Sequence, residues 1–231
     1  MLYLLFPLLF RITPQNINRM PGSHKKNIKL DRCWENLSND QFTKQDYDEY
    51  VVYCHNGLQP SVFKMTSTRT VGVSSSNSNS KVFKIRNVEC TFNENPFINC
   101  VFQDSLINFE GTNNNYIANS NSISNCSNGS GPSSANIMYI NAKTTTIQDN
   151  TITFTSVDIA CRTFRIFNNE KTILMGNQIT NANINTDSSE NGIGAYISGT
   201  NTANPVTISG CTFTTCGKTG GLYVVIFNVP K

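Results

Sequence analysis

The stretch that decides the fold reads Ile147-Gln148-Asp149-Asn150-Thr151-Ile152. It returns as Leu174-Met175-Gly176-Asn177-Gln178-Ile179 and as Ile208-Ser209-Gly210-Cys211-Thr212-Phe213. Each copy has an apolar residue, two spacers, Asn or Cys, one spacer and a second apolar residue. Such short repeated units predict a stacked architecture, because a single unit cannot bury its own apolar side chains. We expect the apolar residues to point inward and the Asn or Cys to stack on its counterpart in the next coil.

A looser pattern, in which Phe or Ile is followed by two spacers and then Asn or Cys, occurs at residues 92–95, 97–100, 123–126 and 213–216. One recurring position can then be followed along the chain, with successive separations of 26, 24, 27 and 34 residues, at Cys100, Cys126, Asn150, Asn177 and Cys211. Periods of this size are typical of solenoids. They predict parallel β-helix coils, each with three short strands and three turns.

The energetics of one coil require stacking. About four inward side chains per coil contribute roughly 6–12 kcal/mol, whereas ordering about 25 residues costs roughly 25–50 kcal/mol. From about residue 62 onward, short apolar segments alternate with Asn, Gly, Ser and Asp turns. We therefore predict an all-β, right-handed parallel β-helix (solenoid) of about six coils with a small mixed N-terminal cap. An antiparallel sandwich or barrel is the alternative, since it also uses many short strands.

The N-terminal part differs from the repeats. Residues 1–14 begin with an almost wholly apolar run, interpreted as a weak secretory signal or a truncated apolar segment. Residues 15–60 are predicted to cap the solenoid. There, Ser38 and Gln41 have the spacing of a capping box, which predicts a short helix to about Glu49, followed by a strand at 50–54. The repeat domain then covers residues 61–231. No apolar run reaches the roughly 20 residues of a transmembrane helix, so we expect no integral membrane span.

The composition is polar without being charged. Charged residues make up 14% of the chain and hydrophobic residues 38%, and 33 residues are asparagine. Asparagine tolerates left-handed backbone, as many tight turns require. The net charge of +3 includes one basic cluster, at Lys25, Lys26, Lys29 and Arg32. No nucleic-acid-binding motif accompanies it, so we expect no nucleic-acid partner.

Eight cysteines and two histidines are present, without a C-x-x-C pair. A zinc site is therefore not expected, and we expect no metal and no cofactor. An even number of cysteines suits disulfides in an exported protein. Small buried thiols are the equally weighted alternative.

The repeats resemble those of polymorphic outer membrane protein-type and related β-helix surface proteins. Those proteins combine Phe-x-x-Asn/Cys units with Gly-Gly-Ala-Ile-like units. Residues 92–95 match the first unit, residues 211–223 match both, and residues 192–197 are a looser copy of the second. The resemblance covers roughly residues 80–227. It implies a pectin-lyase-like β-helix at a cell surface, acting in adhesion or host contact.

Enzymatic candidates are few. Glycoside hydrolysis usually needs two carboxyl groups that flank the scissile bond, and no Asp-Asp pair occurs in the repeats. The best catalytic candidates are Asp158, Arg162 and Arg165, for which a surface ion pair is the simpler interpretation. Asp187 and Glu190 could hold calcium in a turn, although a solvated loop is the simpler interpretation.

The expected function is therefore a non-enzymatic surface or secreted β-helix protein for adhesion or for carbohydrate or protein binding. Its partners would be glycans or host and cell-surface proteins, and its location extracellular or at the cell surface. The alternative is a carbohydrate-active enzyme, a polysaccharide lyase or glycoside hydrolase, on the same fold. The oligomeric state cannot be derived from this sequence.

Overall fold

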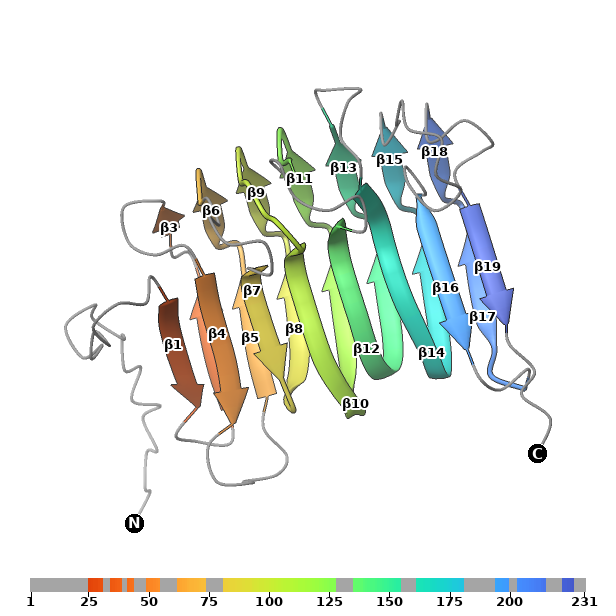
Figure 1. The fold of residues 1–231 in the computed structure, drawn as a ribbon, viewed down its shortest axis with the longest axis horizontal. Coiled ribbons are helices and arrows are strands. Elements are labelled where there is room, and N and C mark those ends of the chain that lie inside the picture. The colour runs from red at the N-terminus through yellow and green to blue at the C-terminus, as the bar shows by residue number, and fades with distance from the viewer. Residues whose placement is uncertain are drawn as a thin grey trace, which may run out of the picture.

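The computed structural model describes residues 25–30, 34–38, 41–43, 49–54, 62–73, 81–127, 135–154, 161–180, 194–199, 203–214 and 222–226. Within these ranges every regular element is a strand, and no residue is helical. The strands stack along one axis from β1 at one end to β19 at the other (Figure 1). All strand pairs between described residues are parallel, as the predicted solenoid requires, so the antiparallel alternative is wrong.

Three faces make up each coil. The first face contains β1 (Lys25–Leu30), β4 (Glu49–Cys54), β7 (Lys81–Arg86), β16 (Ala195–Gly199) and β19 (Leu222–Ile226). The second contains β2 (Trp34–Ser38), β5 (Val62–Thr66), β8 (Glu89–Asn93) and β17 (Val206–Ser209). Three long strands run through both faces, namely β10 (Ser105–Asn119), β12 (Ala135–Gln148) and β14 (Cys161–Met175).

The third face is a separate seven-stranded sheet of very short strands. It contains β3 (Gln41–Thr43), β6 (Arg69–Val71), β9 (Pro96–Ile98), β11 (Ser122–Ser124), β13 (Thr151–Thr153), β15 (Gln178–Thr180) and β18 (Thr212–Thr214). Figure 1 shows these strands as a row beside the longer ones.

The long strands differ from the short segments predicted from the sequence. The first part of β10 pairs with β7 and its last part with β8, so one strand occupies both faces. The register between β10 and β12 shifts between Gly111 and Asn115, which marks the bend from one face to the next. In the preceding coil two separate strands, β7 and β8, meet at this bend, and the left-handed backbone of Asn87 (φ 53°) lies between them.

About four coils are described, rather than the six predicted. Their strands are β7 to β9, β10 and β11, β12 and β13, and β14 and β15, and each coil is free of gaps. The remaining strands belong to coils whose connections lie outside the described residues. They continue the same ladders at both ends.

The predicted helix near Ser38 is wrong. Ser38 ends β2, Gln41 begins β3 and Glu49 begins β4. These strands pair in register with β5, β6 and β7. A capping-box spacing is a local preference, and the long-range backbone ladder of the solenoid overrides it.

Inside the coils, the core is a continuous column of apolar side chains. Phe83 lies edge-on to Phe92 and Phe97, with ring centroids 6.0 and 6.1 Å apart. Phe109 and Tyr116 follow one coil later at 5.2 Å. All five side chains are fully buried. Edge-to-face contacts of this kind add about 0.5–1.5 kcal/mol each beyond area burial.

A column of buried asparagines fills the corner between the second and third faces. We call it the Asn column: Asn95, Asn121, Asn150 and Asn177. The side-chain oxygens of Asn121, Asn150 and Asn177 each accept from both the backbone N–H and the side-chain amide of the Asn one coil earlier, at 2.8–3.1 Å. The side-chain oxygen of Asn95 accepts from the backbone N–H of Thr68. Each side-chain amide also donates to a backbone carbonyl of the preceding coil. The predicted stacking of asparagines is thus confirmed.

The backbone at this corner explains the turn composition. The residue before each member of the Asn column has a left-handed backbone, with φ of 56° at Glu94, 54° at Ser120, 52° at Asp149 and 63° at Gly176. In this left-handed backbone conformation, residues other than glycine are strained by about 1–2 kcal/mol each. The hydrogen bonds of the Asn column offset that strain, at about 0.5–1.5 kcal/mol each.

The alignment of cysteines with asparagines as one recurring position was wrong. Register places Asn121 over Asn95, and places Cys126 five residues later over Cys100. Cys100 and Cys126 therefore form a second column, at the far end of the third face, and both are buried. Cys211 alone joins the Asn column, where its Sγ lies 3.6 Å from Asn177 Nδ2.

Candidate functional site

On the outward side of the first face, side chains of different kinds follow one another from coil to coil. Pairing of β10, β12, β14 and β16 aligns Asn108, Tyr139, Arg165 and Tyr196 in one outward row. The inward rows on either side hold only buried apolar residues, such as Met138, Phe164 and Ile166. Because neighbouring strands lie about 4.8 Å apart, Tyr139 and Tyr196 are separated by about 10 Å along the stack.

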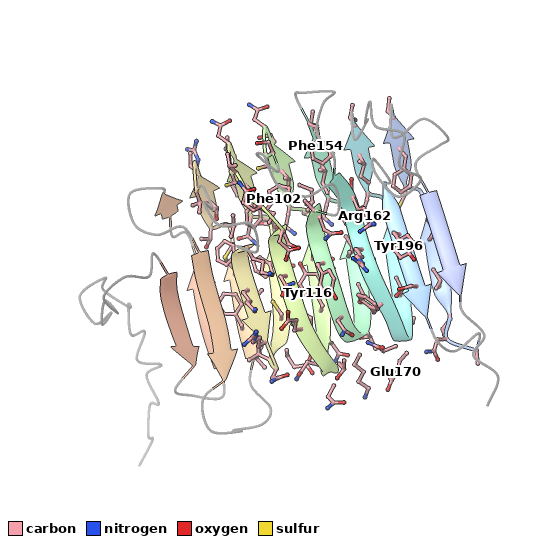
Figure 2. All side chains as sticks on the ribbon, in the orientation of Figure 1. Phe102, Tyr116, Phe154, Arg162, Glu170 and Tyr196 are labelled. Atoms are coloured by element: carbon pink, nitrogen blue, oxygen red, sulfur yellow. The ribbon has the colours of Figure 1, made fainter. Side chains whose placement is uncertain are left out.

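Arginine and aromatic side chains meet on these strands. We call the group Tyr139, Arg162, Arg165, Phe167 and Tyr196 the arginine–aromatic patch. Arg165 Cζ lies 5.5 Å from the Tyr139 ring centroid and 5.6 Å from that of Phe167, and the two rings are 5.5 Å apart. Arg162 Cζ lies 5.5 Å from the Tyr196 ring centroid. Figure 2 shows Arg162 and Tyr196 side by side on neighbouring strands.

These contacts fix the orientation of the arginines before any ligand arrives. A cation over an aromatic ring gains about 0.5–1 kcal/mol when exposed and about 2 when desolvated. Arg162 is only 3% exposed, whereas Arg165 and the three rings are partly exposed. The patch therefore presents the Arg165 guanidinium group and the three aromatic rings to the surface, with the buried Arg162 held against Tyr196.

Several polar atoms around the patch are buried. Asn108 Oδ1, Thr163 Oγ1 and Arg165 Nε have no hydrogen-bond partner among the described residues. Asn108 is 3% exposed and Thr163 is fully buried. Polar atoms in such positions usually bind water or a ligand. They give the patch hydrogen-bonding capacity in addition to its charge and its rings.

The electrostatics of this face favour anions. Among the side chains described on this face, the acids Asp104 and Glu110 are paired: Lys81 Nζ lies 2.6 Å from Asp104, and Arg86 Nε lies 3.2 Å from Glu110. Burial raises the pKa of Tyr139, Arg165 opposes that shift, and Glu110 and Asp104 add to it. The Tyr139 hydroxyl is therefore neutral at physiological pH and can act as a hydrogen-bond donor.

The structure brings together two of the three catalytic candidates derived from the sequence. Arg162 and Arg165 both lie on β14 within the patch. Asp158 lies outside the described residues, as do Asp187 and Glu190. In the described part of the chain, no group of three or more His, Cys, Asp or Glu side chains could hold a metal ion.

Tyr139, Phe167 and Tyr196 were not identified from the sequence. They come from three different coils, and only the register between the coils reveals that they are neighbours. In the sequence, each is one aromatic residue in a strand-like segment, which is the ordinary composition of a strand.

Other sequence-based predictions can be placed as well. Cys90, Cys100, Cys126 and Cys211 are not part of disulfides, and the side chains of the other four cysteines lie outside the described part of the structure. The described ranges hold no helix that is long and apolar enough to cross a bilayer.

Comparisons with models of protein families, with curated proteins and with solved structures found no significant match. The parallel β-solenoid is thus established by the strand pairing itself, and the candidate site is argued from its own geometry.

Proposed function

We propose that this protein is a non-enzymatic surface or secreted protein that binds acidic glycans through the arginine–aromatic patch. The observation that carries the proposal is the contact of Arg165 with Tyr139 and Phe167 on the outward side of the first face. Aromatic ring faces pack against the C–H face of a sugar ring. The planar guanidinium group can pair with a carboxylate or sulfate through two parallel hydrogen bonds.

The shape of the site supports an extended ligand. The outward row crosses several coils without a change in strand direction, so successive sugar units of one chain could contact successive coils. The likeness of residues 92–95 and 211–223 to repeats of polymorphic outer membrane protein-type surface proteins supports display outside the cell. Both features support a role in adhesion.

The test is a glycan array that includes uronic-acid-containing and sulfated glycans, probed with the full chain. We expect binding to acidic glycans that weakens as salt is added, since exposed charge interactions are screened. The affinity for the best glycan is then measured for Arg165→Ala and for Lys171→Ala. Both variants remove one positive charge from β14, but Lys171 is exposed on the second face.

Arg165→Ala should lose about tenfold or more in affinity, equivalent to about 1.4 kcal/mol. Lys171→Ala should stay within about twofold of the original chain. Equal losses in the two variants, or no binding to any acidic glycan, would contradict the proposal. Cleavage of the bound glycan, seen as new reducing or unsaturated ends, would show the carbohydrate-active enzyme instead.

A further inference from the structure

Three asparagines in the described part of the chain occupy turns with a left-handed backbone. They are Asn87, Asn99 and Asn125, with φ of 53°, 55° and 53°, and all three are exposed. Of these, Asn125 is followed two positions later by a hydroxyl-bearing residue, Ser127, whereas the other two are followed there by glutamate and valine. Asn-x-Ser, with x other than proline, is the acceptor sequence for N-linked glycans. Asn125 therefore combines an acceptor sequence with an exposed position in a tight turn.

The folded turn can carry a glycan on Asn125. The backbone N–H of Asn125 donates to the carbonyl oxygen of Thr153 at 3.3 Å, so the backbone is held in the ladder while the side chain is exposed. The next residue, Cys126, is 1% exposed and belongs to the core. The backbone N–H of Ser127 donates to the carbonyl oxygen of Cys100 at 2.9 Å. A glycan on Asn125 Nδ2 thus extends from the surface and displaces no core side chain.

The preceding coil contains the same turn without the acceptor sequence. Ser127 pairs with Val101, and this register places Asn99 beside Asn125 in the neighbouring coil. Both asparagines are exposed, both have a left-handed backbone, and each precedes a buried cysteine. The two turns therefore differ at the one position that decides whether a glycan is attached, and the chain offers its own matched control.

We propose that Asn125 is an acceptor site for an N-linked glycan when the chain passes through a secretory pathway, an inference that rests on the secreted or surface location in the proposed function. The co-reactant is a lipid-linked oligosaccharide diphosphate. Asn125 Nδ2 forms a bond to C1 of the first sugar, and the bond from C1 to the diphosphate oxygen breaks. The lipid diphosphate leaves with the electron pair, and one amide proton passes to a base of the transferase. Because Cys126 is buried and Ser127 is bound in the ladder, attachment precedes folding of this corner.

The experiment expresses the full chain in cultured eukaryotic cells in two forms, one with its own N-terminus and one behind an added cleavable secretion signal. Peptide mass spectrometry, before and after an amidase that releases N-linked glycans, assigns each modified asparagine. We expect a glycan on Asn125 in the original chain and its loss in Asn125→Gln and in Ser127→Ala. Val101→Thr, which keeps the β-branched shape, should gain a glycan on Asn99. Secretion of the original chain should match that of Asn125→Gln, since the glycan lies outside the core.

The two forms separate this inference from the proposed function. An unmodified Asn125 in the chain exported by the added signal, or a glycan that persists in Ser127→Ala, would overturn the inference. Retention inside the cell of the form with its own N-terminus would contradict the secreted location, while a glycan on Asn125 in the other form would still support the acceptor site. Assignment by peptide also separates Asn125 from the two other Asn-x-Ser sequences, at Asn36 and Asn128, whose side chains lie outside the described part of the structure.

Discussion

The Asn column and the arginine–aromatic patch are built by the same ladders, yet they differ in how the sequence repeats. Inside the corner, four successive coils place the same residue at the same position, and each asparagine hydrogen-bonds with the next. On the outward side of the first face, successive coils place Asn108, Tyr139, Arg165 and Tyr196 in one row. The sequence therefore repeats at the position of the Asn column and varies at the position of the outward row.

This difference separates structural from functional demands. A buried amide must satisfy every donor and acceptor, and asparagines stacked in register do so for each other at each step. An outward side chain has no such constraint, so departures from the repeat can serve recognition. In this solenoid, a row that breaks the repeat is therefore where a binding site is expected.

The largest effect is expected inside the Asn column. Asn150→Ala removes the acceptor of the Asn121 backbone N–H and side-chain amide, as well as the donor to Ala118 and Gln148. Each buried group left unsatisfied costs about 1–3 kcal/mol, so the free energy of unfolding should fall by about 3–5 kcal/mol. Urea unfolding measures it. Asn113→Ala, at an exposed position of β10, should change it by less than about 0.5 kcal/mol.

An intermediate loss of stability is expected at high pH, where the buried Tyr116 and the partly buried Tyr139 ionise. Burial raises the pKa of Tyr116 well above its usual range, with a further contribution from Cys90. The folded state thus favours the neutral phenol. Its stabilising contribution is complete below the unfolded pKa of about 10 and is lost as the pH rises from there towards the folded pKa.

The free energy of unfolding should therefore decline above about pH 10, by up to about 1.4 kcal/mol per pH unit from Tyr116. Tyr116→Phe should flatten this decline at little cost, because among the described residues the hydroxyl has one weak partner, Met138 Sδ at 3.8 Å. Tyr139→Phe should flatten it less. Urea titrations near pH 8 and near pH 11 compare the variants, and an unchanged slope in Tyr116→Phe would argue against its burial.

The smallest loss of stability is expected for a substitution in the arginine–aromatic patch. Arg165→Ala loses two cation–π contacts at a partly exposed site, so the free energy of unfolding should fall by only about 0.5–2 kcal/mol. The same variant should lose most of its glycan affinity. If its loss of stability matched that of Asn150→Ala in urea unfolding, the outward row would be a structural element and the comparison would fail.

The sequence was sufficient for the fold class because the turn chemistry is local. A left-handed residue, a buried Asn and a short apolar strand follow one another within six residues, as at 147–152. The sequence was not sufficient to separate the Asn column from the second column, formed by Cys100 and Cys126. Asn121 and Cys126 lie only five residues apart, both are small and buried, and each follows an apolar residue, Ala118 or Ile123, by three positions.

The candidate site was less predictable, for a different reason. Arg162 and Arg165 could be singled out because charge is scarce in the repeats, but their aromatic partners could not. Successive coils here differ in length: Arg165 follows its neighbour Tyr139 by 26 residues, whereas Tyr196 follows Arg165 by 31. Periodicity sets the average coil, whereas the neighbours across coils depend on the register of each pair of strands.

Hydrogen exchange of the backbone amides of Asn95, Asn121 and Asn150 tests the stacked column most directly. Each amide donates to the side chain of the next asparagine, at 3.0, 2.9 and 3.1 Å. All three should exchange only through global unfolding, among the slowest amides of the protein, and Asn150→Ala should release the amide of Asn121 first. Exchange of the three amides at the rate of an unfolded chain would contradict the stacking of coils on which this account depends.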